Sequence, residues 1–446
     1  MLSWLLLINL ALAYVSRPEL DPPKLDIKTN TGKKEGFLFV GPYAGGLTQP
    51  GGYIYDYNGE IVWSGWGRVA GWAGNLQVTE YKGQTVLQST DLRFNNGWGQ
   101  GHVKILSEDY KTVAEVFPGN HRLIDIHEFR IVSDHSAVLT VYEPTNHDLS
   151  SVGGSTNGWL LESIFQEVDL NSGDVIFEWK ASDHVKLSDS LVDRGSKGDT
   201  QFNGWDYFHI NSVDKDGDDY VISSRHYSTI YKIDGKTGDI IWKLVGNQAK
   251  VKSDFNQDFN FDKQHDARIH GGQLSLFDNG VNTSDRSHGK IVDLDQDNKK
   301  ATLKTDVTSP DKVTATSQGN LQVLDDGLLV NWGSAGAVTK FDSNNQVVFH
   351  ATLPANAQSY RGFQFDWQGT SSEAVAVGVS SGKVYVSWNG DTKVREWAVL
   401  SGDSKVASAK RQGFETEIDY GTKGTYVVAG YDGQGNLLGK SSQFTI

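Results

Sequence analysis

The chain has 446 residues, of which 38% are hydrophobic and 11% aromatic, so it can form a sizeable core in one large domain or in two or three ordinary ones. Its 49 glycines and its short runs of Val, Ile, Tyr, Thr and Trp are typical of an all-β protein with many turns. A formal net charge of −14 argues against nucleic acid and anionic membranes as partners, so an anionic ligand would need a local cluster of basic side chains.

The N-terminus reads MLSWLLLINLALAYVS, in which a short apolar run ends in the small-x-small pattern Ala11-Leu12-Ala13. We predict a signal peptide over residues 1–16 and a secreted protein; a buried N-terminal strand is the alternative, because the first residues include no Lys or Arg. No other apolar run has the length of a membrane span. The chain contains no Cys, and its one N-glycosylation sequon, Asn282-Thr283-Ser284, would make the secreted protein a glycoprotein.

Six segments repeat one pattern: an apolar strand, an Asp, a polar turn that usually contains Gly, and a second strand that often ends in an aromatic residue. Their turns lie roughly 50–65 residues apart, close to the period of β-propeller blades of four strands. The segments are YIYDYNGEIVWS from Tyr53, ILSEDYKTVAEVF from Ile105, FQEVDLNSGDVIFEW from Phe165, IYKIDGKTGDIIWKL from Ile230, KIVDLDQDNKKATLKT from Lys290 and VTKFDSNNQVVFHATL from Val338.

The intervening segments supply a second hairpin to each repeat, such as HINSVDKDGDDYVISSRH from His209. The histidine-bearing strand comes first, which is the innermost place beside the central channel. We predict a six-bladed β-propeller over residues 36–370; a seventh blade from the N-terminal residues is the alternative. Residues 371–446 alternate apolar and polar side chains and contain no His, which predicts a small C-terminal β-sandwich of the immunoglobulin or fibronectin kind without chemistry of its own.

Basic residues recur at equivalent places of the inner hairpins. His127 opens HEFR, His209 opens HINS, and His265 opens HDAR, while Arg225 ends the strand that pairs with the His209 strand. Because inner strands begin at one mouth of the channel, we predict that these four residues share an axial pocket and carry the chemistry. Four further residues are expected to bind substrate there, with core packing as the alternative for the two tyrosines: His226, Arg268, Tyr207 and Tyr227.

The histidines and the acidic turns also have interpretations as ordinary structural residues or as metal ligands. A single His is more often a surface or core residue, and this applies to His135, His147, His184, His270, His288 and His350. Zinc is an alternative for three histidines, but Glu128 points away from His127 on a strand and Arg225 would repel a dication, so no metal and no other cofactor is predicted. The acidic turns from Asp214 and Asp293 lack the Gly and Glu of a calcium loop.

The motifs WDYFHINSV, VISSRH, TGDIIWKL, QHDARI, SLFDN and GNLQVLDDGLLVNWG resemble those of the arylsulfotransferase family, in particular its fungal branch, over most of the chain. The resemblance implies a six-bladed propeller in which a histidine takes a sulfuryl group from one phenol and passes it to another without a nucleotide donor. His265 matches that nucleophile, and His127, His209 and Arg225 match its supporting residues. The chain departs from the family at WKLVGNQ, where relatives have a Gly-Gly pair, and it lacks the Cys pair of some bacterial members.

Other functions use the same residue types. A uronate polysaccharide lyase needs Arg or His to neutralise a carboxylate and a His or Tyr base to remove a proton. A cyclase of fungal secondary metabolism would use the pocket to orient and polarise its substrate. A propeller that binds a small molecule without catalysis is the remaining alternative. All of these functions imply a small aromatic or other small-molecule substrate, except the lyase, whose substrate is a polysaccharide.

Overall fold

The computed structural model describes residues 14–69, 72–95, 97–282 and 286–446. Within these ranges the chain forms antiparallel sheets and no α-helix, which confirms the predicted all-β class. No helix of the described part is long and apolar enough to cross a membrane. Residues 1–13 of the predicted signal peptide and Thr283 and Ser284 of the sequon lie outside the described residues. The short 3-10 helices are Ser150–Val152, Ala181–Asp183, Leu187–Asp189, Gln201–Asn203 and Gly333–Ala335.

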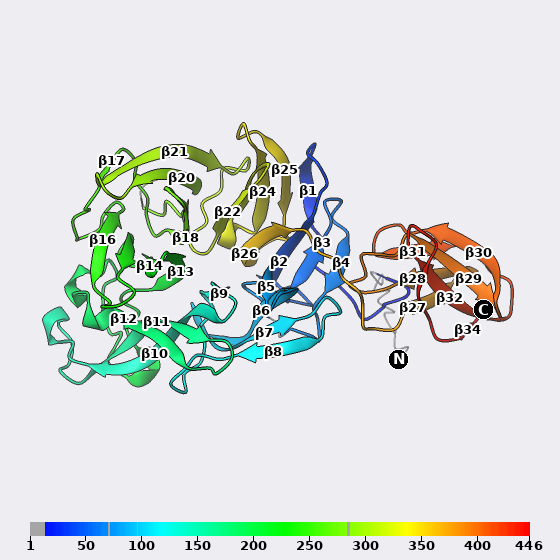
Figure 1. Ribbon diagram of the computed structural model, residues 1–446, viewed down its shortest axis with the longest axis horizontal. Helices are drawn as coiled ribbons and strands as arrows, with labels where there is room; N and C mark the ends of the chain where they lie inside the picture. Colours follow the sequence, from blue (N-terminus) through cyan, green and yellow to red (C-terminus); the bar gives the residue numbers. More distant parts are fainter. Residues whose placement is uncertain (1–13, 70–71, 96, 283–285) are drawn as a thin grey trace, which may run out of the picture.

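In the described chain, six sheets of four or five strands lie around a common centre, in sequence order (Figure 1). The first sheet, from the centre outward, is β26 (Ala357–Phe365), β2 (Phe37–Ala44), β3 (Tyr53–Tyr55) and β4 (Ile61–Ser64). The second is β5 (Gln77–Tyr81), β6 (Gln84–Asn95), β7 (Trp98–Leu106) and β8 (Thr112–Val116). The third is β9 (Phe129–Ile131), β10 (Ser136–His147), β11 (Gly158–Asp169) and β12 (Val175–Lys180).

The other three sheets continue in the same direction. The fourth is β13 (Ile210–Asp216), β14 (Asp219–Ser224), β15 (Thr229–Ile233) and β16 (Ile240–Val245). The fifth is β18 (His265–His270), β19 (Gln273–Asp278), β20 (His288–Asp295) and β21 (Lys300–Thr308), with β17 (Asn256–Gln257) added in parallel at the edge. The sixth is β22 (Asn320–Leu324), β23 (Gly327–Asn331), β24 (Ala337–Asp342) and β25 (Val347–Thr352), with β1 (Asp26–Asn30) at its edge.

The first sheet joins two distant parts of the chain. β26 pairs antiparallel with β2, and Phe39 lies opposite Phe363 in this register. Beyond β4, two further sheets lie outside the ring (Figure 1). One is β27 (Ala376–Ser380), β28 (Lys383–Ser387) and β31 (Glu415–Ile418). The other is β30 (Ser404–Lys410), β29 (Glu396–Ser401), β32 (Thr425–Tyr431) and β33 (Leu437–Lys440), with β34 (Phe444–Thr445) paired to β32.

The repeated Asp of the sequence pattern has a local cause. In the turn after β3, the Asp56 carboxylate accepts the backbone N–H groups of Asn58 and Glu60. The same side-chain capping of a turn occurs at Asp169, Asp234, Asp295 and Asp342. An Asp at the first turn position offers the backbone a partner that the sheet cannot supply, which explains why the residue recurs at these five outer hairpins.

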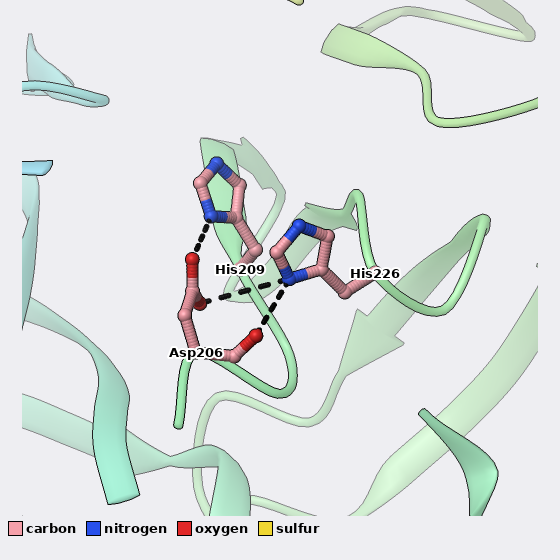
Figure 2. A group of neighbouring side chains, drawn as sticks. All are labelled: Asp206, His209 and His226. Atoms are coloured by element: carbon pink, nitrogen blue, oxygen red, sulfur yellow. Dashed lines mark hydrogen bonds and ion pairs between the residues drawn. The ribbon is translucent and has the colours of Figure 1, made fainter. Parts of the chain in front are cut away.

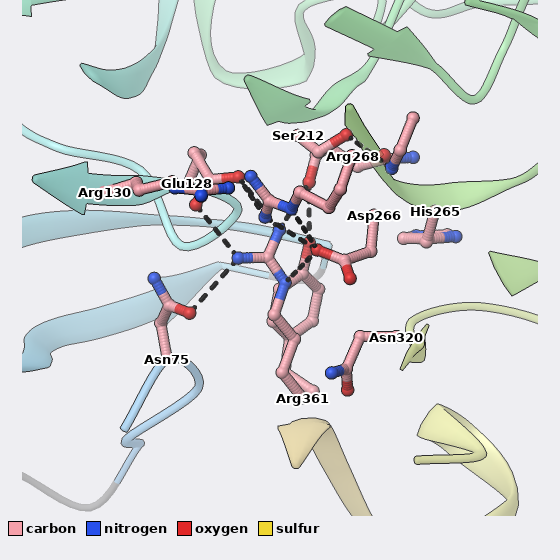
Figure 3. Close-up of polar contacts among 12 residues, drawn as sticks. Asn75, Glu128, Arg130, Ser212, His265, Asp266, Arg268, Asn320 and Arg361 are labelled. Atoms are coloured by element: carbon pink, nitrogen blue, oxygen red, sulfur yellow. Dashed lines mark hydrogen bonds and ion pairs between the residues drawn. The ribbon is translucent and has the colours of Figure 1, made fainter. Parts of the chain in front are cut away.

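A cluster of four buried charges lies where the inner strands meet (Figure 3). Arg268 donates to Glu128 at 2.6 Å and to Asp266 at 2.6 and 2.9 Å. Arg361 donates to both carboxylate oxygens of Glu128 at 3.0 and 3.2 Å and to Asn75 at 3.1 Å. Two positive and two negative groups thus balance each other, and the cluster ties the first, third and fifth sheets together on the axis. We call these four residues the axial ion cluster.

We predict that Glu128→Gln lowers the free energy of unfolding by about 3–5 kcal/mol, because it leaves two buried guanidinium groups with one carboxylate. Burial raises the pKa of Glu128, but the charges of Arg268 and Arg361 outweigh it and lower the pKa to about 2. A carboxylate with a lowered pKa in the folded state stabilises the fold above its unfolded pKa and loses that contribution as the pH falls. The difference in unfolding free energy between wild type and variant should therefore shrink as the pH falls from 4.5, the ordinary pKa of a Glu side chain, toward 2.

Denaturant unfolding at a series of pH values measures this difference. Glu417→Gln is the matched control, since Glu417 pairs with Lys383 on an exposed part of the C-terminal sheets and should matter little. Equal losses of stability in the two variants would contradict the prediction.

Candidate functional site

The three histidines predicted from the repeat lie at the starts of inner strands. His265 is the first residue of β18, His209 directly precedes β13, and His127 lies two residues before β9. The rings of His127 and His209 are perpendicular, with centroids 4.5 Å apart. The ring of Tyr360, from β26, lies 5.6 Å from that of His127 and 6.4 Å from that of His265. The side chains therefore converge, and only 2%, 7% and 2% of the surfaces of His127, His209 and His265 are exposed.

Two of these histidines have carboxylate partners. Nδ1 of His127 is hydrogen-bonded to Oδ2 of Asp125, which also accepts the His127 backbone N–H. Nδ1 of His209 lies 2.6 Å from Oδ2 of Asp206. An ionised carboxylate only accepts hydrogen bonds, so Nδ1 is the protonated nitrogen in both rings. No hydrogen bond to a described residue engages Nε2 of either ring.

His265 has a neutral partner instead. Its Nδ1 lies 2.7 Å from Oδ1 of Asn279, whose amide nitrogen donates to the carbonyl oxygens of Ala315 and Gln318. The amide is thereby oriented with its oxygen toward the ring, so Nδ1 of His265 is the donor. The backbone N–H of Gln318 points at Nε2, with an N–N distance of 3.2 Å. Two independent contacts thus give His265 the same tautomer, with its lone pair on Nε2.

Arg225 and His226 directly follow β14. His226 lies beside Asp206 and His209 (Figure 2), and we call His127, His209, His226 and His265 the histidine group. Nδ1 of His226 donates to the backbone oxygen of Asp206 at 2.8 Å, and Nη1 of Arg225 donates to Nε2 of His226 at 3.0 Å. Nη2 of Arg225 donates to the carbonyl oxygen of Thr316 at 2.9 Å. The guanidinium group is therefore fixed beside the histidines.

Asp206, His209 and His226 have the composition of a metal site, with their possible ligand atoms within 4.8 Å of one another (Figure 2). However, the nitrogens that face Asp206 are the two Nδ1 atoms, and both carry protons in the hydrogen bonds described above. Hydrogen bonding accounts for the close approach of the three groups, and Arg225 adds a positive charge next to them.

Burial dominates the electrostatics of the rings. It lowers the pKa of His265 well below its ordinary value, and the charge of Arg225 lowers it further. Burial also lowers the pKa of His226 well below the usual range. For His209, burial lowers the pKa while the Asp206 carboxylate opposes the shift. Neutral imidazoles are therefore favoured at neutral pH at all three positions.

The backbone is unusual at two points of the site. His209 has a φ of 62° and Asp266 a φ of 54°, both in the left-handed region that non-glycine residues rarely adopt. The second lies within a register shift of β18 between His265 and Arg268. The side chain of Arg268 lies in the axial ion cluster and not in the histidine group, and its guanidinium nitrogens bind Glu128, Asp266 and the Val213 carbonyl.

The two tyrosines expected at the substrate lie among core side chains. The hydroxyl of Tyr207 donates to Glu162 at 2.9 Å, and that of Tyr227 donates to the Lys186 carbonyl at 2.6 Å. Both residues belong to the hydrophobic core around Phe208. Their hydroxyls are already engaged, so the geometry favours the packing role for both.

Sequence reasoning missed the residues that orient the histidines. Asp125 and Asp206 precede their histidines by two and three positions, a local signal that could have identified them. Asn279, Gln318 and Tyr360 come from other strands or loops and have no such signal. On the far side of the axial ion cluster, a cavity of about 310 Å³ is lined by residues farther along the inner strands, among them Arg130, Arg268, His270, Gln322 and Phe363.

One of three comparisons with known proteins, the match to a family model, agrees with the sequence motifs. No curated protein matches the chain. Among solved structures, a protein of unknown function from Bacteroides caccae is similar at 12% identity, over 73% of this chain and 97% of that one, with a TM-score of 0.42. The β-propeller domain of Cps50 (Swd1) from Myceliophteria thermophila is similar at 11% identity, over 82% of this chain and 96% of that one, with a TM-score of 0.39. A family model described as arylsulfotransferase (ASST) matches residues 77–353, more than half of the chain and the whole span of the histidine group. The chain therefore belongs to the arylsulfotransferase family.

Proposed function

We propose that the protein transfers a sulfuryl group between phenols without a nucleotide donor, with Nε2 of His265 as the acceptor. The observation that carries this proposal is the orientation of His265, whose lone pair is on Nε2 beside Arg225, His127 and His209. A neutral imidazole is the form that can attack sulfur, and cations and N–H groups stabilise the charge on the three sulfate oxygens. Membership of the arylsulfotransferase family supports the same chemistry.

The reaction balances in two steps. Nε2 attacks the sulfur of an aryl sulfate, the N–S bond forms, and the bond from sulfur to the phenol oxygen breaks. The phenol leaves as a phenolate whose charge Arg225 stabilises, because Nε2 of His127 and of His209 carries no proton to donate. In the second step an acceptor phenol attacks the sulfur, its proton passes to Nε2 of His127 or His209 and from there to water, and the N–S bond breaks. Nε2 of His265 becomes available only when the Gln318 N–H moves away from it.

We also propose a domain architecture. We interpret the six sheets around the axis as the blades of a propeller over residues 36–370, and the two outer sheets as a C-terminal β-sandwich over residues 371–446. We also propose that the protein is secreted. Backbone N–H groups of Val15 and Ser16 donate to Glu415, so these residues belong to the folded chain, and cleavage after Ala13 is the boundary that fits.

A proton-transfer reaction is the second candidate, as in a uronate lyase or a cyclase. Two carboxylate–histidine pairs whose Nε2 atoms make no hydrogen bond to a described residue are suited to moving protons, and the Gln318 contact leaves His265 less available. An unsaturated uronate chromophore would identify the lyase. A cyclised product formed without any sulfated enzyme would identify the cyclase.

We predict that His265→Asn abolishes the enzyme adduct carrying one SO3 group and lowers turnover at least roughly a thousandfold, because the nucleophile is lost. Intact-protein mass spectrometry after incubation with an aryl sulfate, together with a phenol-acceptor assay, measures both effects. His270→Asn is the matched control, since it makes the same change on the same strand outside the histidine group. Normal turnover in His265→Asn would refute this assignment and favour proton-transfer chemistry.

We predict that Arg225→Lys causes a milder defect, about 10- to 100-fold in kcat/KM. Lysine keeps the charge but cannot reach both His226 and the Thr316 carbonyl as the guanidinium fork does. Steady-state kinetics with the same substrates check this, with Arg130→Lys as control. A defect as large as that of His265→Asn would contradict the prediction that Arg225→Lys is the milder variant.

We predict that deletion of residues 2–13 retains a folded protein inside the cell, whereas deletion of residues 2–16 also lowers its melting temperature because Glu415 loses its Ser16 partner. Cell fractionation and N-terminal sequencing of the secreted full-length protein provide the measurement, and the expected first residue is Tyr14. A full-length chain that stays inside with an intact N-terminus would contradict secretion.

A further inference from the structure

We propose that Asp125, Asp206 and Asn279 are positioning residues that give the site histidines different roles through the charge of the group at Nδ1. The two carboxylates hold His127 and His209 ready to accept and return a proton, and the amide keeps His265 uncharged as the nucleophile. The assignment of these two roles rests on the proposed sulfuryl transfer. The orientation of the rings does not depend on it.

All four histidines of the group share one tautomer. Nδ1 faces Asp125 in His127 and Asp206 in His209. In His265 it faces the oxygen of Asn279, and in His226 it faces the backbone oxygen of Asp206. Asp125 also accepts the backbone N–H of Gly99, and the Asn279 amide donates to two carbonyl oxygens. Every ring therefore presents Nε2, with its lone pair, away from the partner that orients it.

The partners differ in charge although they occupy the same position on the ring. A carboxylate at Nδ1 stabilises the imidazolium form, so a ring with such a partner can take a proton at Nε2. A neutral amide gives no such stabilisation. The groups that face His265 from the other elements are Arg225, His127 and His209, and Arg225 adds a positive charge that disfavours protonation.

The two carboxylates near the histidines, Asp125 and Asp206, lie beside His127 and His209. His209 faces Asp206, His127 and Arg225, and the ring of Tyr142 lies 5.7 Å away. His127 faces Asp125 and His209, with Tyr142 and Tyr360 beside it at 5.2 and 5.6 Å. Both carboxylates of the histidine group thus contact the two rings that would exchange protons with the phenol, and neither contacts the nucleophile.

Nitrogen NMR of the imidazole rings tests the orientation directly and needs no substrate. In the full-length protein at neutral pH, we expect Nδ1 protonated and Nε2 unprotonated for His127, His209 and His265, with each resonance assigned by a His→Gln variant. A protonated Nε2 in any of the three rings would overturn the assignment for that ring. This outcome is independent of activity, so failure of the sulfuryl-transfer proposal and failure of this inference can be told apart.

Charge-changing variants test the division of roles, with opposite expected signs. Asp206→Asn removes the carboxylate and lets an NH2 group face Nδ1, so we expect some Nε2–H tautomer in His209. We also expect kcat to fall roughly 10²–10⁴-fold and the acid limb of the pH–rate profile to move to lower pH. Asp125→Asn should likewise allow some Nε2–H tautomer in His127 and lower kcat. Asn279→Asp should raise the pKa of His265 and move the acid limb to higher pH, because the nucleophile must now lose a proton first.

Asp311→Asn is the matched control. Asp311 accepts from Nε2 of the buried His350 at 2.8 Å, far from the histidine group, so the same substitution should change only the His350 resonances. A fall in activity of Asp206→Asn without movement of its acid limb and without a tautomer change would indicate a purely structural role and overturn the proposal. If Asn279→Asp does not fold, the tautomer of wild-type His265 and the two Asp→Asn variants still decide the question.

Discussion

The arrangement of the site depends on the balanced burial of four charges on the axis. Glu128, Asp266, Arg268 and Arg361 are almost excluded from water, and an unpaired charge at that depth would destabilise the fold by several kcal/mol. Each acidic member is the sequence neighbour of a site histidine, since Glu128 follows His127 and Asp266 follows His265. Arg361 likewise follows Tyr360, whose ring lies between two of the histidines. The ion pairs therefore hold these rings in place.

The cluster also separates two environments on the axis. On one side are the histidines, with two carboxylates, one guanidinium group and aromatic walls. On the other side is the cavity that Arg130, His270 and Phe363 line in part. Arg268 belongs to the boundary because its guanidinium group is held by both carboxylates of the cluster. A net charge of −14 for the whole chain thus gives little information about the local field at the histidines.

Within the histidine group, hydrogen-bond partners decide what equivalent residues can do. The three rings occupy the same place in successive repeats, yet two have carboxylates at Nδ1 and one has an amide. A pair of titratable groups with different surroundings can supply an acid–base function and a nucleophile from a single residue type. Family membership identifies the class of chemistry, whereas the partners of each ring bear on its role.

The sequence by itself determined the all-β class, the repeated hairpins and the approach of His127, His209 and His265, because these follow from strand alternation, turn chemistry and a repeat of nearly constant length. Asp125 and Asp206 could also have been predicted from the sequence, because they precede their histidines by only two and three positions. Only the tertiary structure decided the partners that come from other strands, loops and sheets. Asn279 reaches His265 across a hairpin, and Arg361 reaches Glu128 over a separation of 233 residues. Arg268 binds Glu128, which precedes the third sheet, and the backbone N–H of Gln318, from a distant loop, points at Nε2 of His265. Such contacts depend on how the sheets pack around the axis and on the requirement that every buried charge and polar group find a partner, which no local pattern in the sequence encodes.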